Sequence, residues 1–538
     1  MTDHTENMNE LIKQALKRGA NIIDIPPGIH HIHPDGLDSE ERFVSNNDSG
    51  VKNILFNLKG VENLVVDGHG AELVMHGRII PFSLMNAKNI TLRNFSIDWD
   101  RKFITPGKVL KSEKDMVEVE FPPEYPVKED SGRLVFTGSQ YSSDNLLNVL
   151  EYRMDNKESA YKCHDNYNIR NGYTAKCLGN GIFRVKGSFN TQPSVGNLLL
   201  FMHEPRLSPA IAIDSCENIR LENIDIYHCG GMGVIAQCSR NLYLDNVNVR
   251  LRKDSGDTVS ITADATHFVD CEGDIRIINC LFENQQDDPC NIHGIFRRVI
   301  GRRAPDAIEI VLGHNQQFGV ETIRTGDPVG FYDSRTFELL FESKAKSIEK
   351  ISLEKCILVL DDALPELNLE FLAVMKKQHD VNVLISGCTF RNNRARGLLI
   401  STLGKVLIEN NYFHVPGAAI LIAGDANYWF ESGPVEDVEI RNNFFDNCNY
   451  GVWGNALIDI VPEIKHEHRK IPFHRNISVH HNRIKYFHKP LIHSHSVENL
   501  EFYDNELMES KDYPVSGETI PLFDIDNSMA KSKDIIPG

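Results

Sequence analysis

The chain of 538 residues is 41% hydrophobic, 25% charged and 8% aromatic, so it has enough apolar side chain for a folded core and is neither disordered nor fibrous. Its 75 acidic residues outnumber 57 basic ones, and the formal charge of −18 disfavours nucleic acid, anionic membrane surfaces and polyanionic glycans as partners. No apolar run is long enough to span a membrane. We therefore expect a globular protein with a neutral or cationic ligand.

The first residues and the cysteines bear on the cellular compartment. MTDHTENMNELIKQ contains neither the basic nor the apolar region of an export signal. We expect a cytoplasmic protein, or a secreted or periplasmic one whose signal has been removed. The 11 cysteines include no tight CxxC pair of the kind that binds zinc, which favours buried reduced thiols.

The first predicted element is an amphipathic helix over ELIKQALKRG, with Leu11, Ala15 and Leu16 at helical spacing and Gly19 at its end. IIDIPPGIHHI then reads as a strand, a turn and a strand. We expect the helix to cap the open end of the structure that follows and to cover its edge amides and carbonyls.

A short phrase of alternating apolar and polar residues then recurs along most of the chain. It appears as NITLRNFSI, NIRLENIDI, NLYLDNVNV, DIRIINCLF, NVLISGCTF, KVLIENNYF, DVEIRNNFF, NISVHHNRI and NLEFYDNEL. Several neighbouring copies start 23 residues apart, as at Asn218 and Asn241. The alternation predicts strands, and the short fixed period predicts that each strand lies above its predecessor.

A repeat of this length is too short for a βαβ crossover and too long for a hairpin, and it fits one coil of a parallel β-helix. Apolar residues would stack inside, and asparagines would form ladders at the corners. Leucine-rich repeats are the alternative, but no copy contains a helix-length amphipathic stretch. The predicted fold class is therefore all-β, a parallel β-helix.

Two stretches interrupt the repeat and read as antiparallel strands with polar turns, so we expect two inserted small antiparallel β-barrel-like domains. Insertions of this kind commonly cover the binding face of a solenoid. The predicted organisation is a cap helix and first coils (1–101), the first inserted domain (102–200), central coils (201–296), the second inserted domain (297–380), C-terminal coils (381–510) and a tail (511–538).

The repeat register gathers three aspartates. Aligning Cys280 with Cys388 places Asp288 over Arg396 and Asn291 over Leu399, and a coil of 23 residues places Asp264 over Asp287. Adjacent coils are separated by roughly 4.8 Å. We therefore expect Asp264, Asp287 and Asp288 in one patch beside Arg396.

Crowded carboxylates raise the pKa of one member, which makes a proton donor beside an ionised partner, as in glycosidases. For an isolated DDP sequence, a turn before Pro289 would be the better interpretation, but the recurrence one coil away favours a site. Calcium is a second alternative. His267, His293 and Arg396 nearby suit a network around sugar hydroxyls better than a calcium shell.

Other candidates come from an insertion between two later coils, GDANYWFESG. Trp429 could stack on a sugar ring or fold back over the coil end. Arg394 and Arg396 could bind hydroxyls or neutralise the aspartates. We expect no metal or cofactor, and the predicted substrate-binding residues are His267, Asn291, His293, Arg394, Arg396, Asp425, Asn427, Trp429 and Glu431.

The phrases CLFENQQDDPCNIHG, NNRARGLLIST, KVLIENNYFH and AAILIAGDANYWFESGPVEDVEIRNNFFDNC resemble glycoside hydrolase family 110, the α-1,3-galactosidases. The resemblance spans most of the chain and is most specific from Asp264 to Cys448. It implies a right-handed parallel β-helix with β-barrel insertions, and metal-independent, inverting removal of terminal α-1,3-linked galactose. Family substrates are the blood group B determinant and, for one subfamily, the linear αGal epitope. Bacterial members usually begin with an export signal, which the start of this chain does not show.

The same resemblance assigns the family's catalytic aspartates to Asp264, Asp287 and Asp288, an arrangement similar to that of polygalacturonases. We take Asp264 as the acid and the Asp287/Asp288 pair as the base, an assignment that could be reversed. The expected partner is a galactose-terminated oligosaccharide or glycoconjugate, with no nucleic acid and no membrane, and a homodimer is one possible assembly.

Two rival functions remain at this stage. A β-helix lyase or polygalacturonase would act on acidic glycan and would need a cleft rich in basic residues, which the negative net charge does not indicate. A lyase would also need a cationic base and usually calcium. A non-catalytic carbohydrate-binding β-helix would bind glycan without consuming it. The choice between branched and linear substrates depends on loop geometry.

Overall fold

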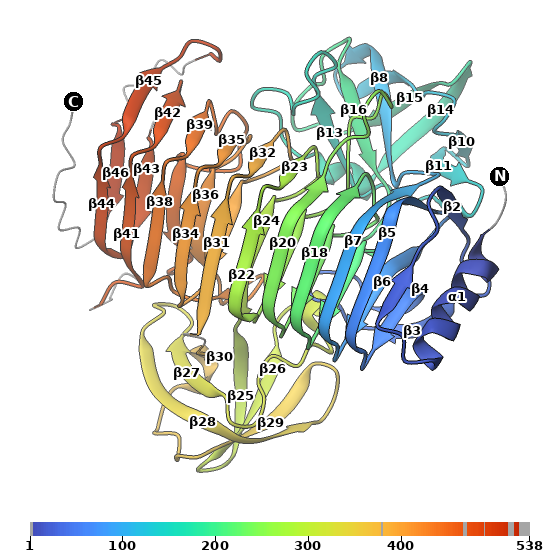
Figure 1. Ribbon diagram of the computed structural model, residues 1–538. Coiled ribbons are helices and arrows are strands. Elements are labelled where there is room, and N and C mark those ends of the chain that lie inside the picture. The colour runs from blue at the N-terminus through green and yellow to red at the C-terminus, as the bar shows by residue number, and fades with distance from the viewer. Residues whose placement is uncertain (1–3, 378–379, 466–470, 489, 515–520, 527–538) are drawn as a thin grey trace.

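The computed structural model describes residues 4–377, 380–465, 471–488, 490–514 and 521–526, and it is a β-helix with two insertions (Figure 1). The helix α1 (Thr5–Lys17) lies at the N-terminal end of the solenoid and buries Met8 and Ile12 against its core. The predicted capping helix is confirmed. Within the described ranges, no helix combines the length and the apolar character that a membrane span requires.

One long parallel sheet forms a face of the solenoid. Its strands are β1 (Ile22–Asp24), β2 (Ile29–Ile32), β5 (Glu62–Met75), β7 (Lys88–Trp99), β18 (Glu217–Ile226), β20 (Arg240–Val249), β22 (Glu272–Ile278), β23 (Leu281–Glu283), β31 (Val381–Ser386), β32 (Thr389–Arg391), β34 (Lys405–Glu409), β35 (Tyr412–His414), β38 (Asp437–Arg441), β39 (Phe444–Asp446), β41 (His474–His480), β42 (Arg483–Tyr486), β44 (Val497–Tyr503) and β45 (Glu506–Glu509). The C-terminal coils continue this sheet without interruption (Figure 1).

A second sheet forms the opposing face and carries the site described below. Its strands are β3 (Asp38–Arg42), β4 (Gly50–Lys59), β6 (Ile79–Met85), β17 (Ile211–Asp214), β19 (Val234–Gln237), β21 (Thr266–Val269), β24 (Cys290–Ile295), β33 (Leu398–Ser401), β36 (Ile420–Gly424), β40 (Ile458–Pro462), β43 (Ile492–His495) and β46 (Phe523–Asp526), with β37 (Glu431–Ser432) paired to β24. Strand β46 lies within the predicted tail, of which 515–520 and 527–538 fall outside the described residues.

The period of the sequence is the length of a coil. Strands β18 and β20 pair in parallel with Glu217 opposite Arg240, 23 residues further along. At the corner, the Asn246 amide donates to Asn223, and Asn223 donates to Asn94, at 3.0 and 3.2 Å. Both Asn223 and Asn246 have φ near +53°, a left-handed conformation that asparagine tolerates better than most residues. The predicted asparagine ladders are confirmed.

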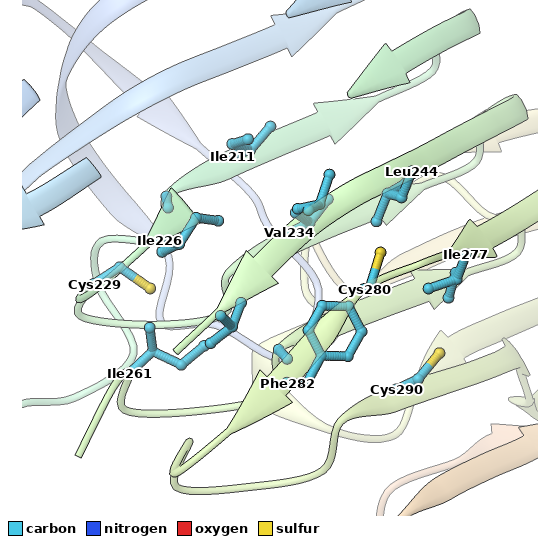
Figure 2. Close-up of a cluster of buried hydrophobic side chains, with 14 of the residues drawn as sticks. Ile211, Ile226, Cys229, Val234, Leu244, Ile261, Ile277, Cys280, Phe282 and Cys290 are labelled. Carbon is cyan, nitrogen blue, oxygen red and sulfur yellow. The ribbon is translucent and has the colours of Figure 1, made fainter. Parts of the chain in front are cut away.

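The interior is a column of stacked apolar side chains and thiols. Figure 2 shows Ile226, Leu244, Ile277 and Phe282 pointing into this column from β18, β20, β22 and β23, with Cys280 and Cys290 beside them. All 11 cysteines are free, and eight of them are buried. The alternation read from the sequence therefore corresponds to inward and outward positions on each strand.

The first insertion leaves the solenoid after β7 and returns before β17. Its antiparallel strands are β8 (Ile104–Glu113), β9 (Met116–Glu120), β13 (Asn148–Tyr152), β14 (Tyr173–Gly179), β15 (Ile182–Gly187) and β16 (Leu198–Met202) in one sheet, and β10 (Val127–Asp130), β11 (Arg133–Gly138) and β12 (Tyr141–Ser143) in another. A short 3-10 helix, η1 (Tyr167–Asn171), connects two of these strands and reaches toward the solenoid.

The second insertion is a closed six-stranded antiparallel barrel with its own apolar core. Its strands are β25 (Arg297–Ala304), β26 (Ala307–Leu312), β27 (Pro328–Asp333), β28 (Leu339–Lys350), β29 (Lys355–Leu360) and β30 (Leu372–Lys376), with the short 3-10 helices η2 (Asn315–Gln317) and η3 (Leu369–Phe371) in its loops. Figure 1 shows the two insertions projecting from opposite edges of the solenoid. The predicted all-β fold with two inserted antiparallel domains is confirmed.

Candidate active site

A pocket of about 870 Å³ opens on the second sheet, and both insertions contribute to its wall. This volume lies within the roughly 300–1,000 Å³ typical of ligand pockets. Tyr167 and Arg170 come from η1 of the first insertion, whereas His314 and Gln316 come from the loop around η2 of the second. The coils supply the floor. The insertions therefore wall a pocket on the solenoid, as insertions often do.

The three predicted aspartates meet on this floor. Asp264 lies just before β21, and Asp287 and Asp288 lie just before β24, so the turns that enter two adjacent strands carry all three. One carboxylate oxygen from each lies within 4.8 Å of those from the other two. The structure thus brings the predicted patch together.

The expected stacking of Asp264 over Asp287 is wrong by one residue. Thr266 lies opposite Cys290 in the β21–β24 pair, so this coil is longer by one residue and its register places Asp264 beside Asp288. The expected stacking of Asn291 over Leu399 is confirmed. The error comes from assuming a coil of 23 residues where the β21–β24 coil has 24.

Three arginines surround two of the carboxylates. Asp287 is ion-paired with Arg206 and with Arg394, whose Nη1 lies 3.2 Å from its Oδ1. Asp288 accepts hydrogen bonds from the backbone N–H of Arg396 at 2.8 Å and from its Nε and Nη2 at 3.2 and 2.7 Å. These contacts supply the positive charge that two buried neighbouring carboxylates require.

Asp264 has a different environment. Burial and the charge of Asp287 raise the pKa of Asp264 to about 8. Its Oδ2 lies 2.6 Å from His267 Nδ1, and burial lowers the pKa of that histidine to about 4. Burial also raises the pKa of Asp288 to about 7, against the attraction of Arg396. Burial and the neighbouring charge of Asp287 therefore favour the protonated form of Asp264.

The two predicted histidines extend from Asp264 into the protein, first His267 and then His293. His267 lines the pocket, and its Nε2 lies 2.8 Å from Nε2 of His293. His293 does not line the pocket, and its Nδ1 lies 2.7 Å from the carbonyl oxygen of Gly294. The prediction that His293 binds substrate directly is therefore not supported by its position, because His267 separates it from the pocket.

The loop 425–431 forms one side of the pocket mouth. Asp425 accepts hydrogen bonds from the backbone N–H groups of Asn427 at 2.6 Å and Phe430 at 3.2 Å, so this side chain holds the loop in shape. The Asn427 side chain donates to the carbonyl of Ser334 at 3.4 Å and lies off the pocket wall. Asn427 therefore belongs to the barrel contact and not to the pocket.

Trp429 and Glu431 do line the pocket. The Trp429 ring packs against His314, with ring centroids 4.5 Å apart, and remains 38% exposed at the mouth. Glu431 accepts from Asn46 at 2.9 Å and from the predicted residue Asn291 at 3.2 Å. An exposed indole above buried polar groups is an arrangement that suits a sugar ring.

Several residues in or beside the pocket escaped sequence reasoning; most of them lie in or beside the first insertion, and Trp453 lies among the C-terminal coils. Arg206 follows β16, and Tyr167 belongs to η1. Asp165 accepts from Arg394 Nε and Nη2, both at 2.8 Å, and Trp453 donates to Asp165 at 3.1 Å. None of these residues belongs to a recurring phrase, and an arginine or tyrosine outside a repeat gives no signal of position.

Two groups of side chains could in principle hold a metal ion: Asp264 with Asp287 and Asp288, and His267 with His293 and Glu431. In the first group, three arginines already supply positive charge and would repel a cation. In the second, the facing histidine nitrogens are 2.8 Å apart, shorter than the roughly 3.3 Å that tetrahedral zinc with bonds of about 2.0 Å would set between them. We therefore assign no metal to either group.

Comparison with known proteins identifies the family. Family descriptions that match are "GLAA-B beta-barrel domain I" over residues 106–199, "GLAA-B beta-barrel domain II" over 307–368 and "Right handed beta helix region" over 373–519. The chain is 36% identical over 518 residues to "Alpha-1,3-galactosidase A" of Shewanella woodyi, covering 94% of this chain and 83% of that protein. It is 34% identical over 464 residues to "Alpha-1,3-galactosidase B" of Bacteroides thetaiotaomicron, covering 85% and 75%.

Solved structures with similar architecture are more distant. The A-module of mannuronan C-5 epimerase AlgE6 of Azotobacter vinelandii aligns with a TM-score of 0.36 at 8% identity, covering 98% of this chain and 96% of that one. The tailspike protein of E. coli bacteriophage HK620 aligns with a TM-score of 0.39 at 10% identity, covering 98% and 61%. A likeness of this degree says nothing about activity. The extent and identity of the sequence matches, by contrast, show that the chain belongs to the α-1,3-galactosidase family, glycoside hydrolase family 110.

Proposed function

We propose that this protein is an exo-acting glycoside hydrolase that removes terminal α-1,3-linked galactose by inversion at the anomeric carbon. The observation that carries the proposal is the cluster of three carboxyl groups on the pocket floor, two of them buried and Asp287 half-buried, in a chain from this family. Asp264 holds a proton, whereas Asp287 and Asp288 are ion-paired with arginines. A proton donor beside ionised carboxylates is the equipment that glycosidic bond cleavage requires.

In the proposed mechanism, Asp264 protonates the departing glycosidic oxygen, and the Asp287/Asp288 pair accepts a proton from the attacking water. Asp288 lies beside Asp264 in the register of the two coils, and burial sets its pKa at about 7. A base that titrates near neutral pH takes up a proton readily at the pH where the acid is still protonated. Arg396, which donates to Asp288, orients the base.

The spacing of the carboxyl groups does not by itself support inversion. The nearest oxygens lie within 4.8 Å of one another, closer than the roughly 6.5–9.5 Å usual for inverting pairs and nearer to the roughly 5–5.5 Å of retaining ones. Inversion is inferred from the family. For inversion, the attacking water must lie between carboxyl oxygens that are farther apart than the closest ones.

We further propose that the pocket mouth binds the rest of the substrate. Trp429 would stack on a sugar ring, and Arg394 and Arg396, like Asn291 and Glu431, would contact hydroxyls at its edge. The blood group B determinant and the linear αGal epitope are the proposed substrates. A homodimer stays a prediction, and sedimentation velocity would test it.

Free galactose released from a B trisaccharide and from galactosyl-α-1,3-galactose tests the function. Asn in place of Asp264, Asp287 or Asp288 should each lower turnover by at least about 100-fold in a protein that remains folded at the assay temperature, as circular dichroism would check. The matched control is Asp270→Asn, a buried aspartate at the far end of β21 that does not line the pocket. Binding of glycan without release of galactose would favour the non-catalytic alternative, and unsaturated products absorbing in the ultraviolet would favour a lyase.

A further inference from the structure

Behind Asp264, two histidines continue a line of short contacts into the protein. Asp264 Oδ2 lies 2.6 Å from His267 Nδ1, His267 Nε2 lies 2.8 Å from His293 Nε2, and His293 Nδ1 lies 2.7 Å from the Gly294 carbonyl oxygen. The three side chains are between 1% and 3% exposed. Each contact is of hydrogen-bond length, so each gap must contain one proton.

The carbonyl at the end of this line determines where the protons sit. A carbonyl oxygen only accepts, so His293 must carry a proton on Nδ1. A neutral His293 then has a bare Nε2, and the proton between the two rings must belong to His267 Nε2. If His267 is also neutral, its Nδ1 is bare, and the remaining proton, in the contact of 2.6 Å, comes from Asp264.

The same three gaps can be filled in two other ways, both with Asp264 ionised: either His267 is an imidazolium with a proton on each ring nitrogen, or His293 is the imidazolium. Both would place a carboxylate beside Asp287 and a cation among buried groups. Glu431 lies 3.6 Å from His293 Nε2, beyond hydrogen-bond distance, and is already supplied by Asn46 and Asn291. Burial lowers the pKa of both histidines, that of His267 to about 4, so the neutral arrangement is favoured.

We propose that His267 and His293 are positioning residues that hold the catalytic proton on Asp264, through a chain of hydrogen bonds anchored on the Gly294 carbonyl. The inference rests on the proposed function for the use of that proton. The charged groups that face the chain are Asp287, Asp288, Arg206, Arg396 and Glu431. His293 acts without touching substrate, because it lies behind the pocket wall.

The pair His293→Asn and His293→Gln tests the chain. Asparagine can still donate to the Gly294 carbonyl but ends short of the position of Nε2, so His267 becomes free to carry its proton on Nδ1 and to donate to an ionised Asp264. Glutamine reaches that position with an oxygen that accepts from His267. In His293→Asn, the alkaline limb of the kcat/KM profile should move down by about one pH unit from its position near pH 8, a loss of about fivefold at pH 8 with little change at pH 6. His293→Gln should retain the limb of the wild type.

An unchanged alkaline limb in His293→Asn, or an equal loss at every pH, would overturn the proposal in favour of a purely structural histidine. A second measurement needs neither substrate nor variant stability. Nitrogen-15 NMR of histidine-labelled protein at pH 7 should show one proton on His293, at Nδ1, and one on His267, at Nε2. A doubly protonated His267 would overturn the chain, whereas absence of galactose release by the wild type would overturn only the proposed function.

Discussion

Replacing Arg394 with methionine should destabilise the protein strongly, because Arg394 neutralises two buried carboxylates. Its Nε and Nη2 donate to Asp165, both at 2.8 Å, and its Nη1 donates to Asp287 at 3.2 Å. The side chains of Arg394 and Asp165 are only 11% and 10% exposed, so water screens the pair little. Removing one partner of a buried pair costs about 3–5 kcal/mol. We expect about 3 kcal/mol, since Asp165 can take up a proton and relieve part of the cost.

The stability of the wild type and of Arg394→Met should depend on pH in opposite directions, because the pKa of Asp165 differs between them. Burial alone would raise the pKa of Asp165, but the charge and hydrogen bonds of Arg394, with those of Asn148 and Trp453, hold it below its usual value. In the wild type, Asp165 therefore contributes stability above its unfolded pKa of about 3.9, and this is lost as the pH falls. Without Arg394, burial places the folded pKa above the unfolded one, so the variant should lose stability as the pH rises.

Urea unfolding followed by tryptophan fluorescence would measure both effects, since Trp453 donates to Asp165 at 3.1 Å and reports on this site. Wild type, Arg394→Met, Asp165→Asn and the double variant should be compared at pH 5 and pH 8. Adding Asp165→Asn to Arg394→Met should recover much of the lost free energy. A loss below about 1 kcal/mol at pH 8, the range of an exposed ion pair, or no recovery in the double variant, would show that Arg394 is not needed to neutralise Asp165.

Three further predictions concern activity. The kcat/KM profile should be a bell with limbs near pH 7 and pH 8, because Asp288 gains a proton below about 7 and Asp264 loses its own above about 8; activity that stays flat from pH 5 to 9 would contradict this assignment. Trp429→Ala should raise KM by about tenfold with little change in kcat, from loss of the stacking ring, and an unchanged KM would place the ring outside the substrate site. EDTA should leave the rate of galactose release unchanged. A loss of activity that calcium restores would contradict the assignment of no metal to the three aspartates.

The solenoid could be predicted in detail because the same kinds of side-chain contact recur from coil to coil. Inward residues such as Leu221 and Leu244 recur at a spacing of one coil, and corner asparagines such as Asn223 and Asn246 recur with them. Each coil repeats the same side-chain contacts, so one phrase in the sequence specifies both a strand and its neighbour. The interruptions were equally visible, since the phrase is absent there.

The site was predictable only where it shares that period. Asp288 and Arg396 meet because their coils keep the register, whereas Asp264 moved by one position because the β21–β24 coil is longer by one residue. A residue added in a turn leaves no mark on the alternation of either strand. Arg206 and Tyr167 reach the pocket from the first insertion, and their positions depend on how that insertion packs on the solenoid.

In the proposed function, the three aspartates hydrolyse an α-galactoside with inversion. Proton NMR of the wild type acting on galactosyl-α-1,3-galactose, recorded within the first turnovers, shows which anomer of galactose is released. We expect β-galactose to appear first and α-galactose to grow in later by mutarotation. Initial release of α-galactose would contradict inversion and favour a covalent intermediate on a carboxylate, in keeping with the short carboxyl spacing, and no release of galactose would contradict the function itself.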